Sequence, residues 1–339
     1  MRDEERWYPG KMVDRLLERK AKRRPFFDVV EDPTSEFLKE LKDKYGFIPV
    51  STWLISPQER TYRDQEIVDL TIPLERIDFT HSSTGYRYSI LEPEIVRRVL
   101  SYYSDEYDLF LDPFYGWGEK MLVSLDMNRN YIGFDVQVRT IERGKVLLRK
   151  YGKYVDVNAS IYLEDGTEIK RVVDEVNRTG EPTVDIIFAS PPYYKVEIYG
   201  EEKEQLSHLD YPDFLRAMKR GAENYYWALK PGKFCIMAVG DFRYMERVEK
   251  DPEHTRGKYK IFTSYHSDII EVFKMAGFEL HDIIVLIKPI SEPTMAYSAW
   301  TVERRKNTIK IHEYLIVFRK PVKPYHQYSV CEMYDGGKQ

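Results

Sequence analysis

Between about residue 81 and residue 320, short apolar segments alternate with longer amphipathic ones. The apolar segments predict buried strands at Leu109–Asp112, Tyr131–Asp135, Tyr154–Val157, Val184–Ala189, Lys233–Val239, 279–287 and Glu313–Arg319. Helices are predicted between them, from about Gly118 and over 138–151, 167–178, 213–229 and 264–276. This alternation is typical of an α/β fold, here a doubly wound parallel sheet of seven strands. The irregular stretch before the last strand indicates an antiparallel edge strand.

Composition excludes several classes of protein. With 339 residues of which 42% are hydrophobic, the chain can form a substantial core. The 52 Lys and Arg residues nearly balance the 56 Asp and Glu residues, so a uniformly basic nucleic-acid binder is excluded, although local basic patches are not. No apolar run is long enough to span a membrane and no signal peptide is recognisable, so we expect a soluble cytoplasmic protein. Two cysteines and widely spaced histidines predict that the protein binds no metal. The many Glu, Lys and Arg residues, with few Asn and Gln, indicate a heat-adapted protein.

The first 80 residues differ in pattern from the rest. Met12–Arg24 is predicted to be a short helix that ends in a basic cluster, and Thr34–Tyr45 a second, amphipathic helix. Residues 46–80 contain short β-like pieces without a clear period. We therefore expect an N-terminal accessory or substrate-docking region at 1–80, a catalytic domain at 81–320 and a C-terminal tail at 321–339.

Carboxylates follow three successive predicted strands. Asp112 opens a glycine-containing turn, Asp112-Pro113-Phe114-Tyr115-Gly116-Trp117-Gly118, which lacks the third glycine of the dinucleotide fingerprint. Asp135 ends the second strand, where a carboxylate can accept hydrogen bonds from ribose hydroxyls, and Asp165 follows the third strand, where it can accept from an adenine amine. An acid beside the turn repels a pyrophosphate but suits a cofactor that carries an ammonium and a sulfonium. Each acid alone is equally well explained as a helix cap or loop residue; three at neighbouring strand ends favour a ligand site.

The fourth predicted strand runs directly into Ser190-Pro191-Pro192-Tyr193. Two consecutive prolines hold the chain extended and supply no backbone N–H, so this corner presents carbonyl oxygens and the serine hydroxyl as acceptors. With the flat ring of Tyr193, the corner suits a planar base that bears an exocyclic amine, since base–aromatic stacking contributes about 1–3 kcal/mol. The alternative is a Pro-Pro loop that merely ends a strand.

These segments carry a family resemblance. LDPFYGWG, YIGFD, DIIFASPPYY, LKPGKFCIMAV and IHEYLIVFRKP resemble the S-adenosylmethionine-dependent amino-methyltransferases of nucleic acids over about residues 81–320. The resemblance implies a Rossmann-like methyltransferase sheet, S-adenosylmethionine as cofactor, and Ser190, Pro191, Pro192 and Tyr193 as catalytic residues. The cofactor-binding residues that it implies are Tyr88, Asp112, Pro113, Phe114, Gly116, Gly118, Asp135 and Asp165. Glu119-Lys120 departs from the family, which often has small hydroxylated residues there.

Ser190 is most like the residue of the N4-cytosine members, whereas adenine-modifying members commonly carry Asp or Asn there. The resemblance therefore implies direct transfer of a methyl group to the N4 amine of cytosine, without the nucleophilic cysteine that C5 methylation needs. The target base must leave its stack or already be single-stranded.

The nature of the nucleic acid depends on the segments 243–262 and 289–311, which are rich in basic and aromatic residues. The substrate-binding candidates are Tyr194, Arg243, Arg256, Lys258, Trp300, Arg304 and Arg305. Either segment can equally be a solvated loop, and Tyr194 a core residue. Small recognition segments favour structured RNA, and the chain is similar to archaeal ribosomal-RNA cytidine N4-(di)methyltransferases. The alternatives are a DNA N4-cytosine or N6-adenine methyltransferase of a restriction–modification system and a non-catalytic methyltransferase-like subunit.

Overall fold

The computed structural model describes residues 35–55, 62–71, 91–152, 156–192, 194, 205–247, 258–287, 306 and 308–323. The chain divides into two compact units, Met1–Pro49 and Val50–Gln339. In the first, α3 (Glu36–Tyr45) confirms most of the helix predicted at Thr34–Tyr45 and ends at Gly46, whose φ of 81° stops the helix. The helix predicted at Met12–Arg24 lies outside the described residues. Within the described ranges, none of the helices is long and apolar enough to cross a membrane.

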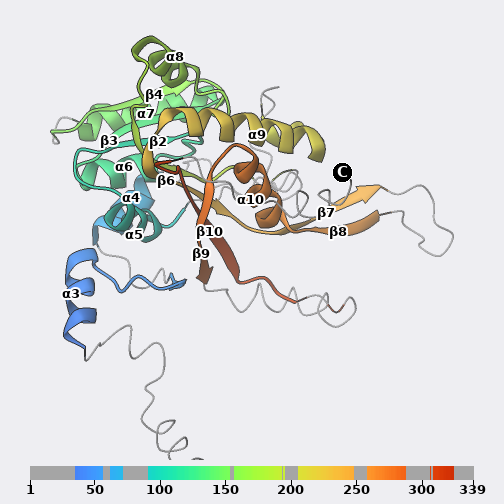
Figure 1. The fold of residues 1–339 in the computed structure, drawn as a ribbon, viewed down its shortest axis with the longest axis horizontal. Helices are drawn as coiled ribbons and strands as arrows, with labels where there is room; N and C mark the ends of the chain where they lie inside the picture. Colours follow the sequence, from blue (N-terminus) through green and yellow to red (C-terminus); the bar gives the residue numbers. More distant parts are fainter. Residues whose placement is uncertain are drawn as a thin grey trace, which may run out of the picture. The chain divides into compact units, whose positions relative to one another are not determined.

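The second unit is built on an eight-stranded sheet, which confirms the predicted α/β fold class (Figure 1). In spatial order the strands are β1 (Thr52–Leu54), β9 (Glu279–Ile287), β10 (His312–Arg319), β6 (Leu229–Val239), β5 (Val184–Ala189), β2 (Leu109–Asp112), β3 (Asn130–Asp135) and β4 (Ala159–Leu163). The helices of this unit are α4 (Tyr62–Thr71), α5 (Pro93–Tyr103), α6 (Glu119–Asp126), α7 (Val138–Tyr151), α8 (Lys170–Thr179), α9 (Tyr211–Ala228) and α10 (Tyr265–Met275).

Both faces of the sheet are covered. Leu111 and Ile187 pack on one face with side chains of α8, α9 and α10. Phe110 and Phe188, the neighbouring residues on the same strands, point to the other face and stack with their ring centroids 6.5 Å apart. Because every residue of β5 is buried, the run Val184–Ala189 is apolar apart from Asp185 instead of alternating with polar residues.

The sheet differs from the prediction in strand number and in the place of the antiparallel strand. β1 is an eighth strand, which pairs parallel with β9 at the edge. β10 is antiparallel as expected, but it lies between β6 and β9 and pairs with both. The physical reason is its continuous apolar run, Leu315–Phe318, which is wholly buried and so belongs inside the sheet.

The third predicted strand lies further along the chain than expected. Tyr154–Val157 was its predicted range, whereas β4 is Ala159–Leu163, and residues 153–155 lie outside the described residues. The side chain of Asn130 accepts a hydrogen bond from the backbone N–H of Asn158 (3.0 Å), and Tyr131 N–H donates to Asn158 O (2.8 Å). These contacts start the pairing at Ala159 opposite Tyr131.

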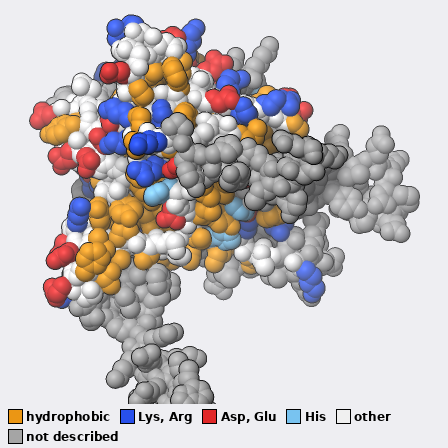
Figure 2. Space-filling model, viewed as in Figure 1, with side chains coloured by type: hydrophobic (Ala, Val, Ile, Leu, Met, Phe, Trp, Pro, Cys, Tyr) orange, Lys and Arg blue, Asp and Glu red, His pale blue; other side chains and the backbone are white. Residues whose placement is uncertain are grey.

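Part of the predicted accessory region belongs to the unit that carries the sheet. β1 extends the sheet, and Asp64 of α4 accepts a hydrogen bond from Arg97 of α5 at 2.7 Å. The predicted docking role of residues 1–80 stays a prediction. On the face shown in Figure 2, acidic and basic side chains are interspersed among hydrophobic ones, in keeping with the small net charge of −4.

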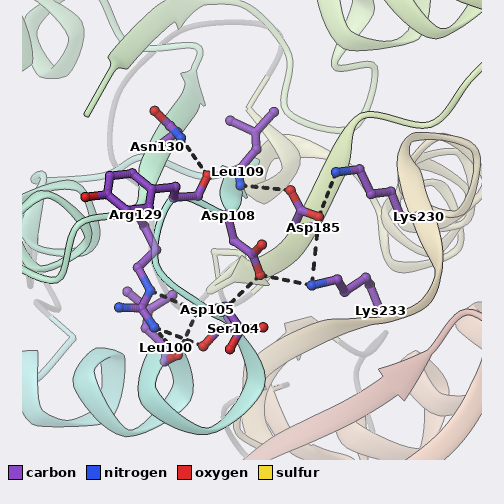
Figure 3. A network of polar contacts seen from close by, with 11 residues as sticks. Leu100, Ser104, Asp105, Asp108, Leu109, Arg129, Asn130, Asp185, Lys230 and Lys233 are labelled. Carbon is purple, nitrogen blue, oxygen red and sulfur yellow. Dashed lines mark hydrogen bonds and ion pairs between the residues drawn. The ribbon is translucent and has the colours of Figure 1, made fainter. Parts of the chain in front are cut away.

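A buried carboxylate joins three strands at the amino-terminal edge of the sheet (Figure 3). Asp185 of β5 accepts hydrogen bonds from Leu109 N–H of β2 (3.0 Å) and from Lys230 Nζ of β6 (2.8 Å). Lys233 lies 3.8 Å from the same carboxylate and 3.0 Å from Asp108 just before β2. The network aligns β2, β5 and β6, so that their other ends meet at one edge.

Replacing Asp185 with Asn is expected to lower the free energy of unfolding by about 1–3 kcal/mol, because a largely buried carboxylate with charged donors is lost. Urea unfolding measures the change. Asp174→Asn on the exposed face of α8 is the matched control, and an equal effect of the two substitutions would contradict the structural role of Asp185.

The loop after β4 packs directly on the turn after β2. A Cβ atom added at Gly166 would lie 1.7 Å from the carbonyl oxygen of Pro113. Gly166→Ala is therefore expected to cost about 1–3 kcal/mol or more, because backbone must move to make room. Gly152→Ala, where a Cβ meets nothing within 4 Å, is the control. Denaturation midpoints compare the two, and a neutral Gly166→Ala would show that the loop is free to shift.

Candidate active site

A pocket lies at the carboxyl-terminal edge of the parallel strands. It encloses about 1020 Å³ of empty space, a figure that includes its solvent-open mouth. Its walls come from the segments after β2, β3, β4 and β5, and from the start of β10. The lining residues are Leu91, Pro113, Phe114, Gly116, Trp117, Glu119, Lys120, Asp135, Val136, Gln137, Thr140, Asp165, Gly166, Ser190, Pro191, Pro192, Gln205, Leu206 and Glu313.

The glycine turn after β2 is held against the end of β3. Gly116 and Gly118 have φ values of 61° and 98°, which residues with a side chain rarely adopt. The turn lets Gly116 N–H donate to Asp135 Oδ2 at 3.0 Å and Tyr115 N–H donate to Phe134 O at 2.7 Å. The turn after β2 and the end of β3, which are about one βα unit apart in the sequence, thereby form one continuous wall of the pocket.

Asp112 lies behind this wall and is not among the lining residues. Its side chain is fully buried, and Oδ1 is 2.8 Å from Lys120 Nζ and accepts from Phe114 N–H at 3.2 Å. Oδ2 accepts from the hydroxyl of Tyr131 at 2.6 Å. Burial raises the pKa of Asp112, against the opposing effect of Lys120. Asp112 is therefore held inside the protein, away from the pocket surface.

Asp135 lines the pocket. Its Oδ1 accepts from Gln137 N–H at 2.8 Å, while Oδ2 accepts from Gly116 N–H. Burial raises the pKa of Asp135 to about 6, and these hydrogen bonds oppose the rise only in part. A ligand that donates hydrogen bonds to this carboxylate would favour its ionised form.

Asp165 lies next along the edge. Its Oδ1 accepts from both the backbone N–H and the hydroxyl of Thr167, each at 2.8 Å. Arg220 of α9 donates to Oδ2 at 3.2 Å and to the Thr167 hydroxyl at 2.8 Å. These contacts orient the carboxylate at the pocket wall formed by the loop after β4.

The corner after β5 forms the opposite wall, with Ser190, Pro191 and Pro192 all in the lining. Tyr194 N–H donates to Pro192 O at 3.0 Å, and Tyr194 has a φ of 23°. The Tyr194 ring is 3% exposed and stacks with Phe242 at a centroid distance of 6.0 Å. Of the two alternatives for Tyr194, the structure places it in the core, because the tight turn directs the ring inward as an anchor of the corner rather than toward a substrate. Tyr193 lies outside the described residues.

The segment 243–262 carries several substrate-binding candidates. Its described parts, residues 243–247 and 258–262, belong to a two-stranded ribbon of β7 (Phe242–Arg247) and β8 (Lys258–Thr263) (Figure 1). The Arg243 guanidinium lies over the half-exposed ring of Phe262, 4.9 Å from its centroid. The backbone of Lys258 lies opposite that of Arg247 in the antiparallel register of the ribbon. The remaining substrate-binding candidates, Arg256, Trp300, Arg304 and Arg305, lie outside the described residues, as does the cofactor-binding candidate Tyr88.

Several lining residues were not anticipated from the sequence. Glu119 and Lys120 were noted only as a departure from the family pattern, yet both line the pocket. Gln137 and Thr140 follow Asp135 closely, so proximity to that strand end was a usable signal. Glu313 carried no signal, because only the placement of β10 between β6 and β9 brings its start to this edge.

The pocket combines apolar walls, carboxylates and carbonyl acceptors. Ser190, Pro191 and Pro192 on one side and Asp135 and Asp165 on the other can hold two hydrogen-bond-donating groups in a fixed relation. Among the described residues, no group of three or more His, Cys, Asp or Glu side chains is placed to hold a metal ion.

Solved structures with a similar course of the chain include several methyltransferases. A SAM-dependent methyltransferase from Methanosarcina mazei is 14% identical, with a TM-score of 0.42 over 66% of this chain and 98% of that one. TrmN from Thermus thermophilus is 14% identical, with a TM-score of 0.39 over 68% and 49% of the two chains. A putative DNA modification methylase from the same organism, solved with S-adenosyl-L-methionine, is 20% identical, with a TM-score of 0.29 over 50% and 58%.

A sequence comparison with curated proteins finds no match. The DNA methylase family model for N6 and N4 methyltransferases, however, matches residues 36–145 and 184–336, which is well over half of the chain. The match includes the turn after β2, Asp135 and the Ser190–Pro192 corner. It confirms the resemblance drawn from the sequence, and with it a methyltransferase of the kind that modifies nucleic acid, with S-adenosylmethionine as cofactor. The chain belongs to the N6/N4 DNA methylase family.

Proposed function

We propose that this protein methylates the exocyclic N4 amine of cytosine in nucleic acid, with structured RNA, such as ribosomal RNA, as the favoured substrate. The observation that carries the proposal is the shared pocket. Ser190, Pro191 and Pro192 line it together with Asp135 and Asp165, so an amine-binding corner faces a wall suited to a nucleoside cofactor. Within a family that modifies either N4 or N6, Ser190 at the head of the corner favours cytosine.

The residues present fit S-adenosylmethionine. Asp135 and Asp165 both line the pocket, where Asp135 would accept hydrogen bonds from the ribose hydroxyls and Asp165 from the adenine amine. Pro113, Phe114 and the two glycines of the turn form the wall between them and the corner. One oxygen of the buried Glu119 carboxylate also lacks a hydrogen-bond partner within the described part of the chain, as expected of a site that awaits a ligand. When bound, S-adenosylmethionine supplies a methyl group activated by a sulfonium.

The corner would act on the amine by accepting hydrogen bonds. The lone pair of a cytosine amine is delocalised into the ring, which makes the amine a poor nucleophile. If its two protons are donated to the Ser190 hydroxyl and the Pro191 carbonyl, the nitrogen becomes more pyramidal and its lone pair more localised. The Tyr194 anchor keeps these acceptors in place, and holding two reactants in line removes much of the entropic cost of their encounter. We propose Tyr193 as the stacking partner of the base.

Substrate choice rests on the ribbon between β6 and α10. The ribbon is small, and it presents the exposed Phe262 ring with Arg243 above it, a combination that suits a base and its phosphate. A small element of this kind favours RNA recognised by shape. The second candidate, a DNA N4-cytosine or N6-adenine methyltransferase, is favoured by the family itself, which is described by its DNA methylases.

Incubation with tritiated-methyl S-adenosylmethionine and either total RNA or genomic DNA tests the proposal. We expect label in RNA, recovered as N4-methylated cytidine after digestion to nucleosides. Ser190→Ala should retain cofactor binding but lose at least about tenfold in rate, since a hydrogen bond to the reacting amine is removed. Label confined to DNA would establish the second candidate, and label on adenine would refute the choice of base. Cofactor binding without transfer to either polymer would indicate a non-catalytic subunit.

The pKa of Asp135 gives a pH prediction for cofactor binding. The ionised carboxylate accepts ribose hydroxyls, so affinity should fall as the pH drops below about 6, by about tenfold between pH 7 and pH 5. Calorimetry with 5′-methylthioadenosine, which keeps the nucleoside and lacks the amino-acid end, measures this part alone. Asp135→Asn should bind weakly without this pH dependence, whereas Asp174→Asn should behave as the parent chain. An unchanged profile in Asp135→Asn would remove Asp135 from the cofactor site.

A further inference from the structure

We infer that Glu119 binds the α-ammonium group at the amino-acid end of S-adenosylmethionine, the part that the sequence pattern had given to Asp112. The inference rests on the proposed function for the placement of the cofactor in this pocket. It concerns a residue that departs from the pattern of the family, so the family resemblance does not supply it.

The first observation is an unsatisfied carboxylate oxygen in the pocket. Glu119 is the first residue of α6, lines the pocket and is 5% exposed. The carboxylate oxygen Oε2 has no hydrogen-bond partner in the described part of the chain. A buried carboxylate oxygen without a donor is costly, and a bound cation with N–H donors removes that cost.

The second observation is that the carboxylate of Asp112 already has partners within the protein, Lys120 and Tyr131. Lys120 Nζ lies 2.8 Å from Asp112 Oδ1 and donates to Phe114 O at 2.7 Å. The ammonium group of Lys120 therefore neutralises the charge of the Asp112 carboxylate within the protein interior. Asp112 is fully buried and does not line the pocket, whereas Glu119 lines it and has an oxygen without a partner in the described part of the chain. Of these two carboxylates, Glu119 is therefore the one available to a ligand.

The third observation is the order of the strands. The sheet runs β5, β2, β3, β4, and their following segments carry Ser190, Glu119, Asp135 and Asp165 respectively. A ligand with adenine at Asp165 and ribose at Asp135 continues toward the end of β2, where α6 begins. Its amino-acid end thus meets Glu119, with the corner at Ser190 beyond it for the base.

Burial raises the pKa of Glu119 to about 7, and the groups that act on it are Lys120, which lowers it, and Asp112, which raises it. Burial raises the pKa values of two nearby phenols, Tyr115 and Tyr131, and the charge of an ionised Glu119 adds to the rise. An ammonium bound at Oε2 would favour the ionised carboxylate. Binding near pH 7 should then release a proton from Glu119.

The test compares Glu119→Gln with the parent chain by calorimetry, using S-adenosylhomocysteine and 5′-methylthioadenosine, which lacks the amino-acid end. Gln keeps the size of the side chain and removes its charge. We expect S-adenosylhomocysteine to bind about 10- to 100-fold more weakly, because a charge-assisted hydrogen bond is lost, and 5′-methylthioadenosine to bind as before. Glu142→Gln on the exposed face of α7 is the matched control.

Equal affinities of Glu119→Gln and the parent chain for S-adenosylhomocysteine would overturn the inference and leave the proposed function intact. Failure of the parent chain to bind either ligand would overturn both. If the variant does not fold, the parent chain alone decides, through calorimetry at pH 6.5 in two buffers with different enthalpies of ionisation. S-adenosylhomocysteine should then release more protons than 5′-methylthioadenosine, and equal release by the two ligands would contradict a role for Glu119.

Discussion

The parallel pairing of β5, β2, β3 and β4 is the constraint on which the rest of the structure depends. Parallel strands end at the same edge, so residues far apart in the sequence meet there: Ser190, Asp135 and Asp165 all line one pocket. The registers at this edge are held from the opposite one, where Asp185 joins β2, β5 and β6. The backbone hydrogen bonds between these parallel strands bring the pocket residues together.

The carboxylates that line the pocket differ in their partners from the carboxylate of Asp112, which lies behind the pocket wall. Behind the wall, Asp112 is paired with Lys120 and hydrogen-bonded by Tyr131, an arrangement that offsets the cost of burial and stiffens the turn. At the wall, burial raises the pKa values of Asp135 and Glu119 to about 6 and about 7, and the charge of Lys120 opposes the rise at Glu119 only in part. These carboxylates favour a ligand that brings hydroxyl or ammonium donors, which is the chemistry of the cofactor that the family uses.

The corner after β5 derives its rigidity from two sources. The rings of Pro191 and Pro192 restrict the backbone of the corner. Two residues after Pro192, Tyr194 anchors the chain by burying its ring against Phe214 and Phe242. A positive φ at Tyr194 is the cost of directing that ring into the core, and the aromatic contacts offset it. The acceptors at Ser190 and Pro191 are therefore held by the core itself.

The sequence by itself determined the fold class, most strand positions and the strand ends after β2, β3 and β5 that line the pocket, because apolar periodicity and turn residues act over a few neighbours. Tertiary structure alone decided the rest. The position of β10 inside the sheet depends on its burial on both faces, and the start of β4 depends on the Asn130–Asn158 contact between strands. Whether an acid lines the pocket or lies behind it is likewise decided by packing: Asp112 is paired with Lys120 and hydrogen-bonded by Tyr131, whereas Glu119, seven residues later, lines the pocket.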